Sequence, residues 1–217
     1  MNVLELFAGS RSFSKVAEEM GCNTYCTDIE PFEGIDQVCD IFDFDIKKIP
    51  FQTEVCWASI PCTTFSVASI GHHWTGGHRA YIPKTKEAEI GLKIVQKTID
   101  IITEINPKYY YIENPRGLLR KLPVIRYAPI RRTVWYCQYG DNRAKPTDIF
   151  TNDMSWIPRN KCFNGNTNCH HEPAPRGSKT GTQGLANNYE RSKVPNQLCL
   201  EILWDYKTDL CRGNFNG

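Results

Sequence analysis

The chain has 217 residues, of which 41% are hydrophobic and 23% are charged, and these values fit one soluble globular domain with a sizeable core. No apolar run is long enough to cross a membrane, and the apolar start at residues 3–7 is too short for a secretory signal, so we expect a cytoplasmic protein without a membrane partner. Ten cysteines are scattered along the chain, and without an export signal we expect them to be reduced thiols.

Charge is distributed unevenly along the chain. Residues 1–60 carry 4 Lys or Arg against 11 Asp or Glu, whereas residues 61–217 carry 22 against 13. This asymmetry suits a hydroxyl-rich or cationic small molecule at one end and a polyanion at the other. Residues 116–132 contain several basic residues and no acid, a pattern that fits either a polyanion surface or a solvated charged face.

Taken in chain order, the apolar pattern predicts short strands at residues 2–7, 24–28, 37–40, 54–60, 108–113, 132–138 and 148–151. Helical spacing is found at residues 13–20 and 86–105, and a further helix is expected from Pro195 onward. Strands that alternate with helices favour an α/β fold with a layered, mostly parallel sheet. Residues 151–189 are rich in small polar residues and poor in aliphatic ones, so we expect a small irregular insert between a core at 1–150 and a C-terminal segment at 190–217.

The first strand, turn and helix have the layout of a nucleoside-cofactor site. The turn Phe7-Ala8-Gly9-Ser10 would let backbone amides approach a ligand, and Asp28 at the end of the next strand would accept hydrogen bonds from ribose hydroxyls. Only one glycine is present, and a purely structural turn explains the pattern equally well.

Two further residues suit catalysis. Cys62 follows Pro61 where the apolar run 55–58 ends, a position that fits a nucleophile, although free cysteines are also common core residues. Glu113 follows the apolar run 109–112, and burial there should raise its pKa and suit it to donate a proton to a ring nitrogen. The alternative for Glu113 is a capped or salt-bridged strand end.

The order of these segments resembles the cytosine-C5 DNA methyltransferase family. The matching segments span nearly the whole chain except the insert, and they are Leu6-Phe7-Ala8-Gly9, Pro61-Cys62, Glu113-Asn114-Pro115, Gln138 with Arg143-Ala144-Lys145, and Glu190-Arg191-Ser192-Lys193-Val194-Pro195. The resemblance implies a Rossmann-like fold that binds S-adenosylmethionine, with helices on both faces of the sheet. It also implies that the last segment folds back onto the first.

The resemblance implies a role for each matching residue. In catalysis, Cys62 would add to C6 of a flipped cytosine, Glu113 would hydrogen-bond N3 and the exocyclic amine, Arg143 would contact the base and orient Cys62, and Lys145 would supply a second positive charge. Pro61, Asn114 and Pro115 would surround the base. The implied cofactor contacts are Phe7, Ala8, Gly9, Ser10, Asp28, Ile29, Asp40, Ile41, Pro61 and Ser192.

The chain departs from the family pattern at several positions. Arg11 and Ser12 stand where the family usually has further glycines, which puts close backbone approach there in doubt. Thr63 replaces a glutamine, Lys145 an arginine and Arg191 an asparagine. None of these changes removes a catalytic group, so we expect an active enzyme.

The insert at 151–189 is much shorter than the target-recognition region of most family members. We therefore expect a monomer that binds double-stranded DNA at a short sequence such as a dinucleotide. It resembles compact enzymes of phages and prophages in bacterial or infected host cells. The loop 67–86 corresponds to the family's mobile catalytic loop. The expected DNA contacts are Ser66, His72, His73, Arg79, Arg176, Lys179 and Gln183.

The insert also contains a group of metal-binding residue types. Cys162, Cys169, His170 and His171 lie within ten residues and suggest a structural zinc site, although their spacing departs from the usual Cys-x2–4-Cys pattern. The alternative is a polar loop whose histidines face phosphate.

Two other functions remain open on the sequence. The family includes a branch that methylates transfer RNA, and the short insert does not exclude it. A catalytically silent protein that binds cofactor or DNA is the other alternative, against which the intact Cys62, Glu113 and Arg143 argue.

Overall fold

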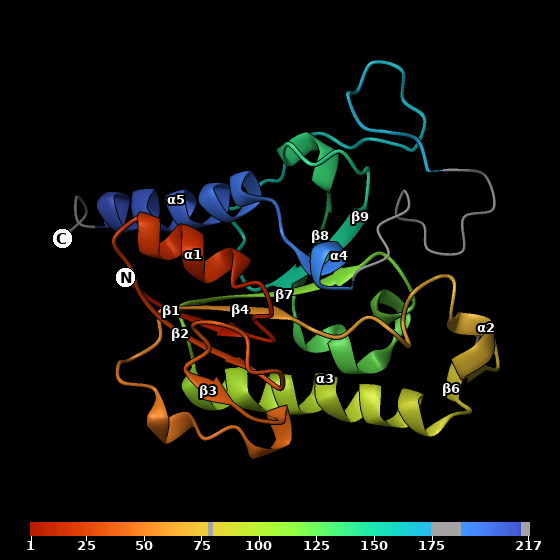
Figure 1. Cartoon of the computed structure of the whole chain (residues 1–217), viewed down its shortest axis with the longest axis horizontal. Coiled ribbons are helices and arrows are strands. Elements are labelled where there is room, and N and C mark those ends of the chain that lie inside the picture. Colours follow the sequence, from red (N-terminus) through yellow and green to blue (C-terminus); the bar gives the residue numbers. More distant parts are fainter. Residues whose placement is uncertain (78–79, 175–187, 214–217) are drawn as a thin grey trace.

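A seven-stranded sheet forms the centre of the molecule (Figure 1). The computed structural model describes residues 1–77, 80–174 and 188–213. The strands lie in the order β3-β2-β1-β4-β7-β9-β8, and their bounds are β1 (Asn2–Leu6), β2 (Asn23–Asp28), β3 (Gln37–Val38), β4 (Val55–Ser59), β7 (Tyr109–Pro115), β8 (Ile130–Trp135) and β9 (Pro146–Thr151). The pairs from β3 to β7 are parallel, whereas β9 is antiparallel to both β7 and β8.

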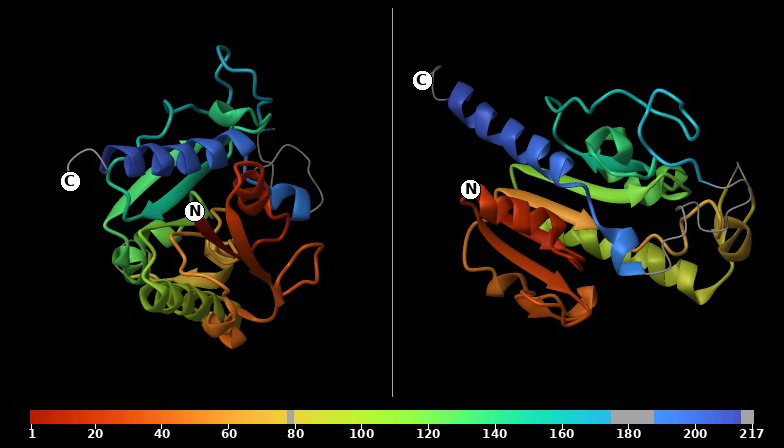
Figure 2. Two further views of the ribbon diagram at one scale, coloured as in Figure 1. Left: turned by 90° about the vertical axis from the view of Figure 1, so that its left-hand side faces the viewer. Right: turned by 45° about the horizontal axis from the view of Figure 1, so that its top comes forward.

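Helices cover both faces of this sheet (Figures 1 and 2). The helices α1 (Ser12–Glu19) and α5 (Asn196–Gly213) pack together on one face, and α3 (Lys86–Ile105) lies on the other. The remaining helical turns are short, namely α2 (Ile70–His73), α4 (Asn188–Ser192), η1 (Ile41–Asp43), η2 (Ile46–Lys48), η3 (Leu119–Lys121), η4 (Pro123–Tyr127) and η5 (Tyr136–Tyr139). The predicted α/β fold with a mostly parallel sheet and two helical layers is confirmed.

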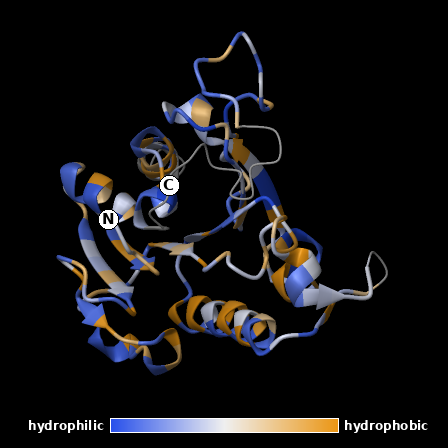
Figure 3. Ribbon diagram, turned by 45° about the vertical axis from the view of Figure 1, so that its right-hand side comes forward, coloured by the Kyte–Doolittle hydropathy of each residue, from blue (hydrophilic) through white to orange (hydrophobic). Residues whose placement is uncertain are grey.

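Alternation along the central strands builds two apolar layers, because successive side chains point to opposite faces of a sheet. In β4, Val55 and Trp57 join the cluster under α1 and α5, whereas Cys56 and Ala58 join the cluster under α3. The Trp57 ring stacks on Phe13 of α1 with 4.7 Å between ring centroids. Figure 3 shows the corresponding apolar residues along α3 in orange. Both faces of the central strands are therefore buried.

Two predicted strands differ from the structure at their ends. The strand expected at 132–138 begins at Ile130 and stops at Trp135, whose partner in β9 is Pro146. Proline has no N–H to continue a ladder, and the chain turns into η5 instead. The strand expected at 37–40 ends at Val38, because the Asp40 side chain accepts a hydrogen bond from Phe42 N–H and caps η1.

Loops contain more structure than the sequence suggested. The polar loop after Cys62 includes α2 and a two-stranded hairpin of β5 (Trp74–Thr75) and β6 (Ile82–Pro83). The described part of the insert, residues 152–174, contains no helix or strand. Within the described residues, no helix has the length and apolar character needed to span a membrane.

The C-terminal segment returns to the start of the chain. Val194 N–H donates to Ser12 Oγ at 3.2 Å, and the Tyr206 hydroxyl donates to Glu54 Oε1 at 2.7 Å. Leu198, Ile202 and Leu203 of α5 are fully buried against α1 and the sheet. The last segment thus covers the face that the first helix leaves open.

The N-terminus of α3 gives a test of the fold. Thr85 is the N-cap residue; its Oγ1 accepts from Ala88 N–H and lies 2.8 Å from His73 Nδ1. We expect Thr85→Ala to lower the free energy of unfolding by about 1 kcal/mol, because the first turn of α3 loses its capping oxygen. Urea denaturation measures this loss. Thr85→Ser keeps the hydroxyl and should retain most of the stability, and an equal loss in both variants would contradict the capping role.

Candidate active site

The Cys62 loop leaves the carboxyl end of β4 and is fixed from two sides. Asn114, on the neighbouring strand β7, donates from Nδ2 to the Ile60 carbonyl oxygen at 3.0 Å. Beyond the cysteine, the N–H groups of Phe65 and Ser66 both donate to the Cys62 carbonyl oxygen at 3.0 Å. These bonds hold the backbone of Cys62, while the residue itself stays partly exposed.

Phe65 anchors the same loop to the protein interior. Its side chain is fully buried, its ring lies 6.0 Å from that of Trp74, and its carbonyl oxygen accepts from Leu118 N–H at 2.7 Å. A Cβ atom at Gly117 would lie 2.2 Å from this oxygen, so the turn after β7 needs glycine to approach so closely. The loop is therefore a rigid support for Cys62.

Glu113 is a buried carboxyl group beside this loop. It pairs in register with Ser59 at the end of β4, and it is 5% exposed. The Tyr136 hydroxyl donates to Glu113 Oε1 at 2.9 Å. Burial raises the pKa of Glu113, and the opposing effects of Lys145 and Tyr136 are too small to cancel this rise. The carboxyl group is thus suited to hold or share a proton.

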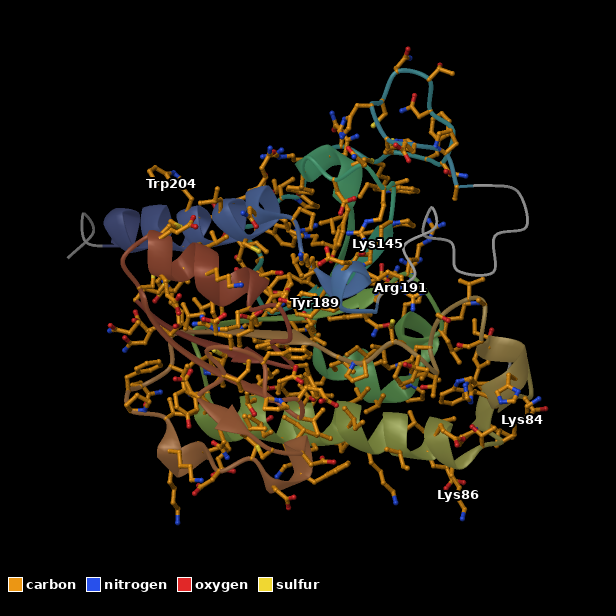
Figure 4. All side chains as sticks on the ribbon, in the orientation of Figure 1. Lys84, Lys86, Lys145, Tyr189, Arg191 and Trp204 are labelled. Carbon is orange, nitrogen blue, oxygen red and sulfur yellow. The ribbon has the colours of Figure 1, made fainter. Side chains whose placement is uncertain are left out.

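Lys145 supplies the positive charge nearest to these two residues. Its Nζ lies 4.4 Å from the centre of the Tyr136 ring and donates to the Arg191 carbonyl oxygen at 3.0 Å. Figure 4 shows Lys145, the residue before β9, near Arg191 of α4. Burial lowers the pKa of Lys145, although Glu113 acts to raise it.

Cys62, Glu113 and Lys145 influence one another electrostatically. Burial raises the pKa of the Cys62 thiol, the Glu113 carboxylate raises it further, and Lys145 acts in the opposite direction. A buried carboxylate and a half-buried ammonium thus act in opposite directions on the pKa of this thiol. Three of the four predicted catalytic residues lie in this group.

The fourth predicted catalytic residue, Arg143, is engaged elsewhere. It is 7% exposed, and its guanidinium forms a two-pronged ion pair with Asp141, with Nε at 2.8 Å from Oδ1. Its Nη1 also donates to the Arg191 carbonyl oxygen at 3.4 Å. Arg143 and Asp141 line a cavity of about 580 Å³ that Cys62 and Glu113 do not reach. In this geometry Lys145 lowers the pKa of the Cys62 thiol, whereas Arg143 is paired with Asp141.

Backbone and side chains converge at the predicted cofactor turn. Gly9 N–H donates to Asp28 Oδ2 at 2.8 Å, and Glu30 N–H donates to Asp28 Oδ1 at 3.0 Å. A Cβ atom at Gly9 would lie 3.9 Å from both Asp28 Oδ2 and Ser192 Oγ. The side-chain-free turn, the carboxylate and the hydroxyl therefore surround one spot, an arrangement that fits the ribose of a nucleoside. Carboxylate lone pairs beyond those used by the two N–H groups remain to accept from its hydroxyls.

The turn adopts its sharp shape without the usual second glycine. Phe7, Gly9 and Arg11 all have positive φ, at 57°, 49° and 56°. Arg11 is held in this unfavourable region by an ion pair with Glu18 and by donation from its Nε to Cys26 Sγ at 3.2 Å. Arg11 thus adopts a backbone conformation that usually favours glycine.

The other predicted cofactor residues differ in exposure. Ile29 is 62% exposed next to Asp28, and Asp40 is exposed at the start of η1. The Ile41 side chain is instead part of the core under α3, because η1 turns it inward. Ala8 and Ser10 are buried within the turn, and Pro61 is exposed beside Cys62.

Few of the predicted DNA contacts can be placed. Ser66 is partly exposed and shares a hydrogen bond with Ser69 (2.9 Å between the two Oγ atoms), and His72 is exposed. His73 differs from the prediction, because it is 8% exposed and is bound to Thr85 at the start of α3. Four expected contacts lie outside the described residues, namely Arg79, Arg176, Lys179 and Gln183.

The basic stretch at 116–132 is partly structural. Arg120 forms a two-pronged ion pair with the buried Asp148 of β9, whose Oδ1 also accepts from Thr133 Oγ1 at 2.8 Å. The Arg116 guanidinium lies 5.4 Å from the centre of the Trp135 ring. These two cations stabilise the sheet edge. Neither a polyanion surface nor a solvated charged face therefore describes every basic residue of the stretch.

The expected metal-binding group is rearranged in the structure. Ligand atoms of Cys137, Cys162, Cys169 and His171 all lie within 4.8 Å of one another. His170 is exposed instead, and its Nε2 lies 3.1 Å from the Asp141 carbonyl oxygen. Cys137 was absent from the expected set because it lies 25 or more residues earlier in the chain, on η5.

Sequence reasoning missed two buried residues that support the site. Tyr136 had no motif signal, although it holds Glu113. Glu5 carried a signal, an acid within the apolar start of the chain: its carboxylate accepts from Phe13 and Ser14 N–H at 3.2 and 2.7 Å and so caps α1. Burial raises the pKa of Glu5 to about 6.

Comparison with known proteins gives a consistent result. The family model described as "C-5 cytosine-specific DNA methylase" matches residues 1–123. A protein of Frog virus 3 (isolate Goorha), named "Probable DNA (cytosine-5)-methyltransferase", is 27% identical over 225 residues, covering 97% of this chain and 100% of the viral protein. The family match includes Cys62 and Glu113, and Lys145 and Ser192 lie beyond it.

A solved structure shares the fold. An E. coli structure described as a "putative DNA modification methyltransferase encoded within prophage" has a TM-score of 0.50 at 12% identity and covers 70% of this chain. A Spodoptera frugiperda DNMT2 structure has a TM-score of 0.46 at 17% identity and covers 73%. The chain spans about half the length of these two proteins, 46% and 54%.

The electrostatic coupling around Cys62 can be tested by alkylation. Glu113→Gln removes a negative charge and should lower the pKa of Cys62, whereas Lys145→Gln removes a positive charge and should raise it. The rate of iodoacetamide labelling at Cys62, followed against pH by peptide mass spectrometry, reports the thiolate fraction. Labelling of Cys39 in the same samples is the internal control. Identical Cys62 profiles in both variants would show that the three groups are not coupled.

Proposed function

The chain belongs to the C-5 cytosine-specific DNA methylase family, and from this premise we propose that it methylates C5 of cytosine in double-stranded DNA through a covalent adduct with Cys62. The observation that carries the proposal is the joint placement of Cys62, Glu113 and Lys145 at the carboxyl ends of β4 and β7 and the start of β9. Ligands of open α/β sheets bind at these strand ends.

S-adenosylmethionine, when bound, supplies the electrophilic methyl group that C5 of the cytosine receives. We assign its ribose to the spot between Gly9, Asp28 and Ser192, with the exposed Ile29 next to Asp28 for the adenine. The turn between β1 and α1 and the segment before α5 would together hold the cofactor. Their hydrogen bond from Val194 N–H to Ser12 Oγ supports this pairing.

The base must leave the DNA stack to reach these residues. Cys62 Sγ then attacks C6 of the ring as a thiolate, which makes C5 nucleophilic. Glu113 holds N3 by a hydrogen bond and stabilises the charge that develops there, and Tyr136 keeps its carboxyl group in place. Loss of the C5 proton with departure of the thiolate restores the aromatic ring.

Lys145 serves two parts of this chemistry. Its positive charge favours the Cys62 thiolate and balances the Glu113 carboxylate. Arg143, held by Asp141, would orient the loop that carries Lys145. Asn114 acts as a positioning residue, because its bond to Ile60 fixes the Pro61-Cys62 backbone.

We further propose that residues 1–150 carry cofactor and catalysis and that the insert at 151–189 reads the target. An insert of only 39 residues offers few base contacts, so the recognition sequence should be short.

The decisive experiment supplies methyl-labelled S-adenosylmethionine with unmethylated plasmid DNA or with transfer RNA. The proposal predicts label in duplex DNA only, and sequencing should place 5-methylcytosine in a motif of two or three bases. Label in transfer RNA alone would redirect the proposal to RNA. A duplex with 5-fluorocytosine should trap a covalent protein–DNA adduct, because fluorine replaces the proton that must leave. Binding to DNA with no adduct and no methylation would indicate a silent binder.

Two variants should separate chemistry from cofactor binding. Cys62→Ser is expected to abolish methyl transfer and to leave S-adenosylmethionine binding unchanged, because Gly9, Asp28 and Ser192 stay intact. Asp28→Ala is expected to weaken cofactor binding by about 1–3 kcal/mol through the loss of charge-assisted hydrogen bonds. Calorimetry beside a methylation assay measures both. Retained turnover in Cys62→Ser would eliminate it as the nucleophile.

A further inference from the structure

Three thiols and one imidazole meet in a closed cluster outside the catalytic group. We propose that Cys137, Cys162, Cys169 and His171 bind one structural zinc ion that fastens the insert to η5. All four ligand atoms lie within 4.8 Å of one another, and Cys162 Sγ is 3.8 Å from His171 Nδ1. In a tetrahedral zinc site, with Zn–S near 2.3 Å and Zn–N near 2.0 Å, neighbouring ligand atoms are roughly 3.5–3.8 Å apart. The side chains therefore need only small inward shifts.

The donor set identifies the metal and its role. Three sulfurs and one nitrogen form a soft ligand set that zinc prefers over magnesium or calcium. Four protein ligands leave no position for a substrate or water, which is typical of structural zinc and unlike catalytic zinc. Cys137, Cys162 and His171 are buried, with 2%, 4% and 4% of their surface exposed, so the cluster is shielded from solvent.

Amide groups around the cluster are placed as metal–thiolate sites require. Asn166 Nδ2 donates to Cys162 Sγ at 3.4 Å, and Gln138 Nε2 donates to Cys169 Sγ at 3.7 Å. Three thiolates around one zinc ion carry a net negative charge, and such donors stabilise it.

The histidine must change one contact when it binds zinc. His171 Nε2 accepts from Gly165 N–H at 3.3 Å, which leaves the ring proton on Nδ1, directed at the Cys162 sulfur. Ligation through Nδ1 replaces this proton with the metal and moves a proton to Nε2. The Gly165 peptide, at φ 79° in a tight turn, then has to rotate away from the ring.

Trp156 and Arg159 attach the start of the insert to α5, but the described residues beyond them have little apolar core of their own. Residues 152–174 contain no helix or strand, and Figure 1 shows them as a long trace that leaves the body of the molecule. Around the four proposed ligands the insert contributes only Cys162 and Cys169 to a small apolar cluster. These two residues pack against Trp135, Cys137 and Ala144. A metal crosslink supplies the folding energy that so small a core cannot.

The crosslink would connect recognition to catalysis, an implication that rests on the proposed function. Cys137 directly precedes Gln138 and the loop that leads to Arg143 and Lys145. On the other side of His171, Glu172 N–H donates to the Asn142 carbonyl oxygen at 2.9 Å, and Glu172 forms a β-bridge with Arg143. The zinc ion would thus fix the DNA-reading segment relative to the catalytic cations.

The primary test measures metal in the full-length protein. It should be made without a polyhistidine tag, purified with a non-thiol reductant and dialysed against EDTA before elemental analysis. We expect close to one zinc ion per chain, and Co²⁺ exchanged into the site should show a thiolate-to-metal charge-transfer band. A protein without zinc, or with two of these cysteines joined in a disulfide, would overturn the proposal.

Matched variants test the ligand set. His171→Ala should reduce the zinc content to below about a tenth, whereas His170→Ala and Cys39→Ser should leave it unchanged. His171→Cys should restore binding through four sulfurs, which a merely structural histidine would not do. Zinc lost from His170→Ala but kept in His171→Ala would overturn the assignment. Circular dichroism of each variant identifies any that fails to fold.

The zinc measurement is independent of the methylation assay because it uses neither DNA nor S-adenosylmethionine. A zinc-loaded protein that methylates nothing would contradict only the proposed function, and an active protein without zinc would contradict only this inference. Removal of zinc with a thiol-reactive mercurial should also speed proteolysis within residues 152–174, which gives a second readout apart from activity.

Discussion

The burial of one carboxyl group, Glu113, is the constraint on which the rest of the site depends. An acid at the end of a buried strand is costly unless it is hydrogen-bonded and balanced by charge. Tyr136 provides the hydrogen bond at 2.9 Å, and Lys145 provides the charge. Burial raises the pKa of Cys62 and Glu113 raises it further, so the same carboxyl group also affects how readily the thiol ionises. Stability and reactivity are therefore linked through a single residue.

The antiparallel edge of the sheet makes this arrangement possible. Strand β9 lies between β7 and β8, so the chain turns through η5 and returns with Lys145 next to the end of β7. The same turn brings Tyr136 under the lysine and Cys137 into the thiol cluster. One connection thus supplies the support for Glu113, the cation near Cys62 and an attachment point for the insert.

The two ends of the chain meet where the cofactor is proposed to bind. Gly9 and Asp28 come from the first βα unit, and Ser192 comes from the segment before α5. Packing of α5 on α1 holds these parts together, since Leu198 and Ile202 are fully buried there. Segments far apart in the sequence thus contribute to one site.

The sequence by itself determined the α/β class, the two helical layers, the long helix at Lys86–Ile105 and the family, because period and motif order are local properties of the chain. It also placed Cys62 and Glu113 at strand ends. Only the tertiary structure decided that Tyr136 supports Glu113 and that Arg143 pairs with Asp141. It also decided that Cys137 replaces His170 among the candidate metal ligands. These contacts join strands through the order β7-β9-β8, and pairing order between distant segments leaves no periodic trace in the sequence.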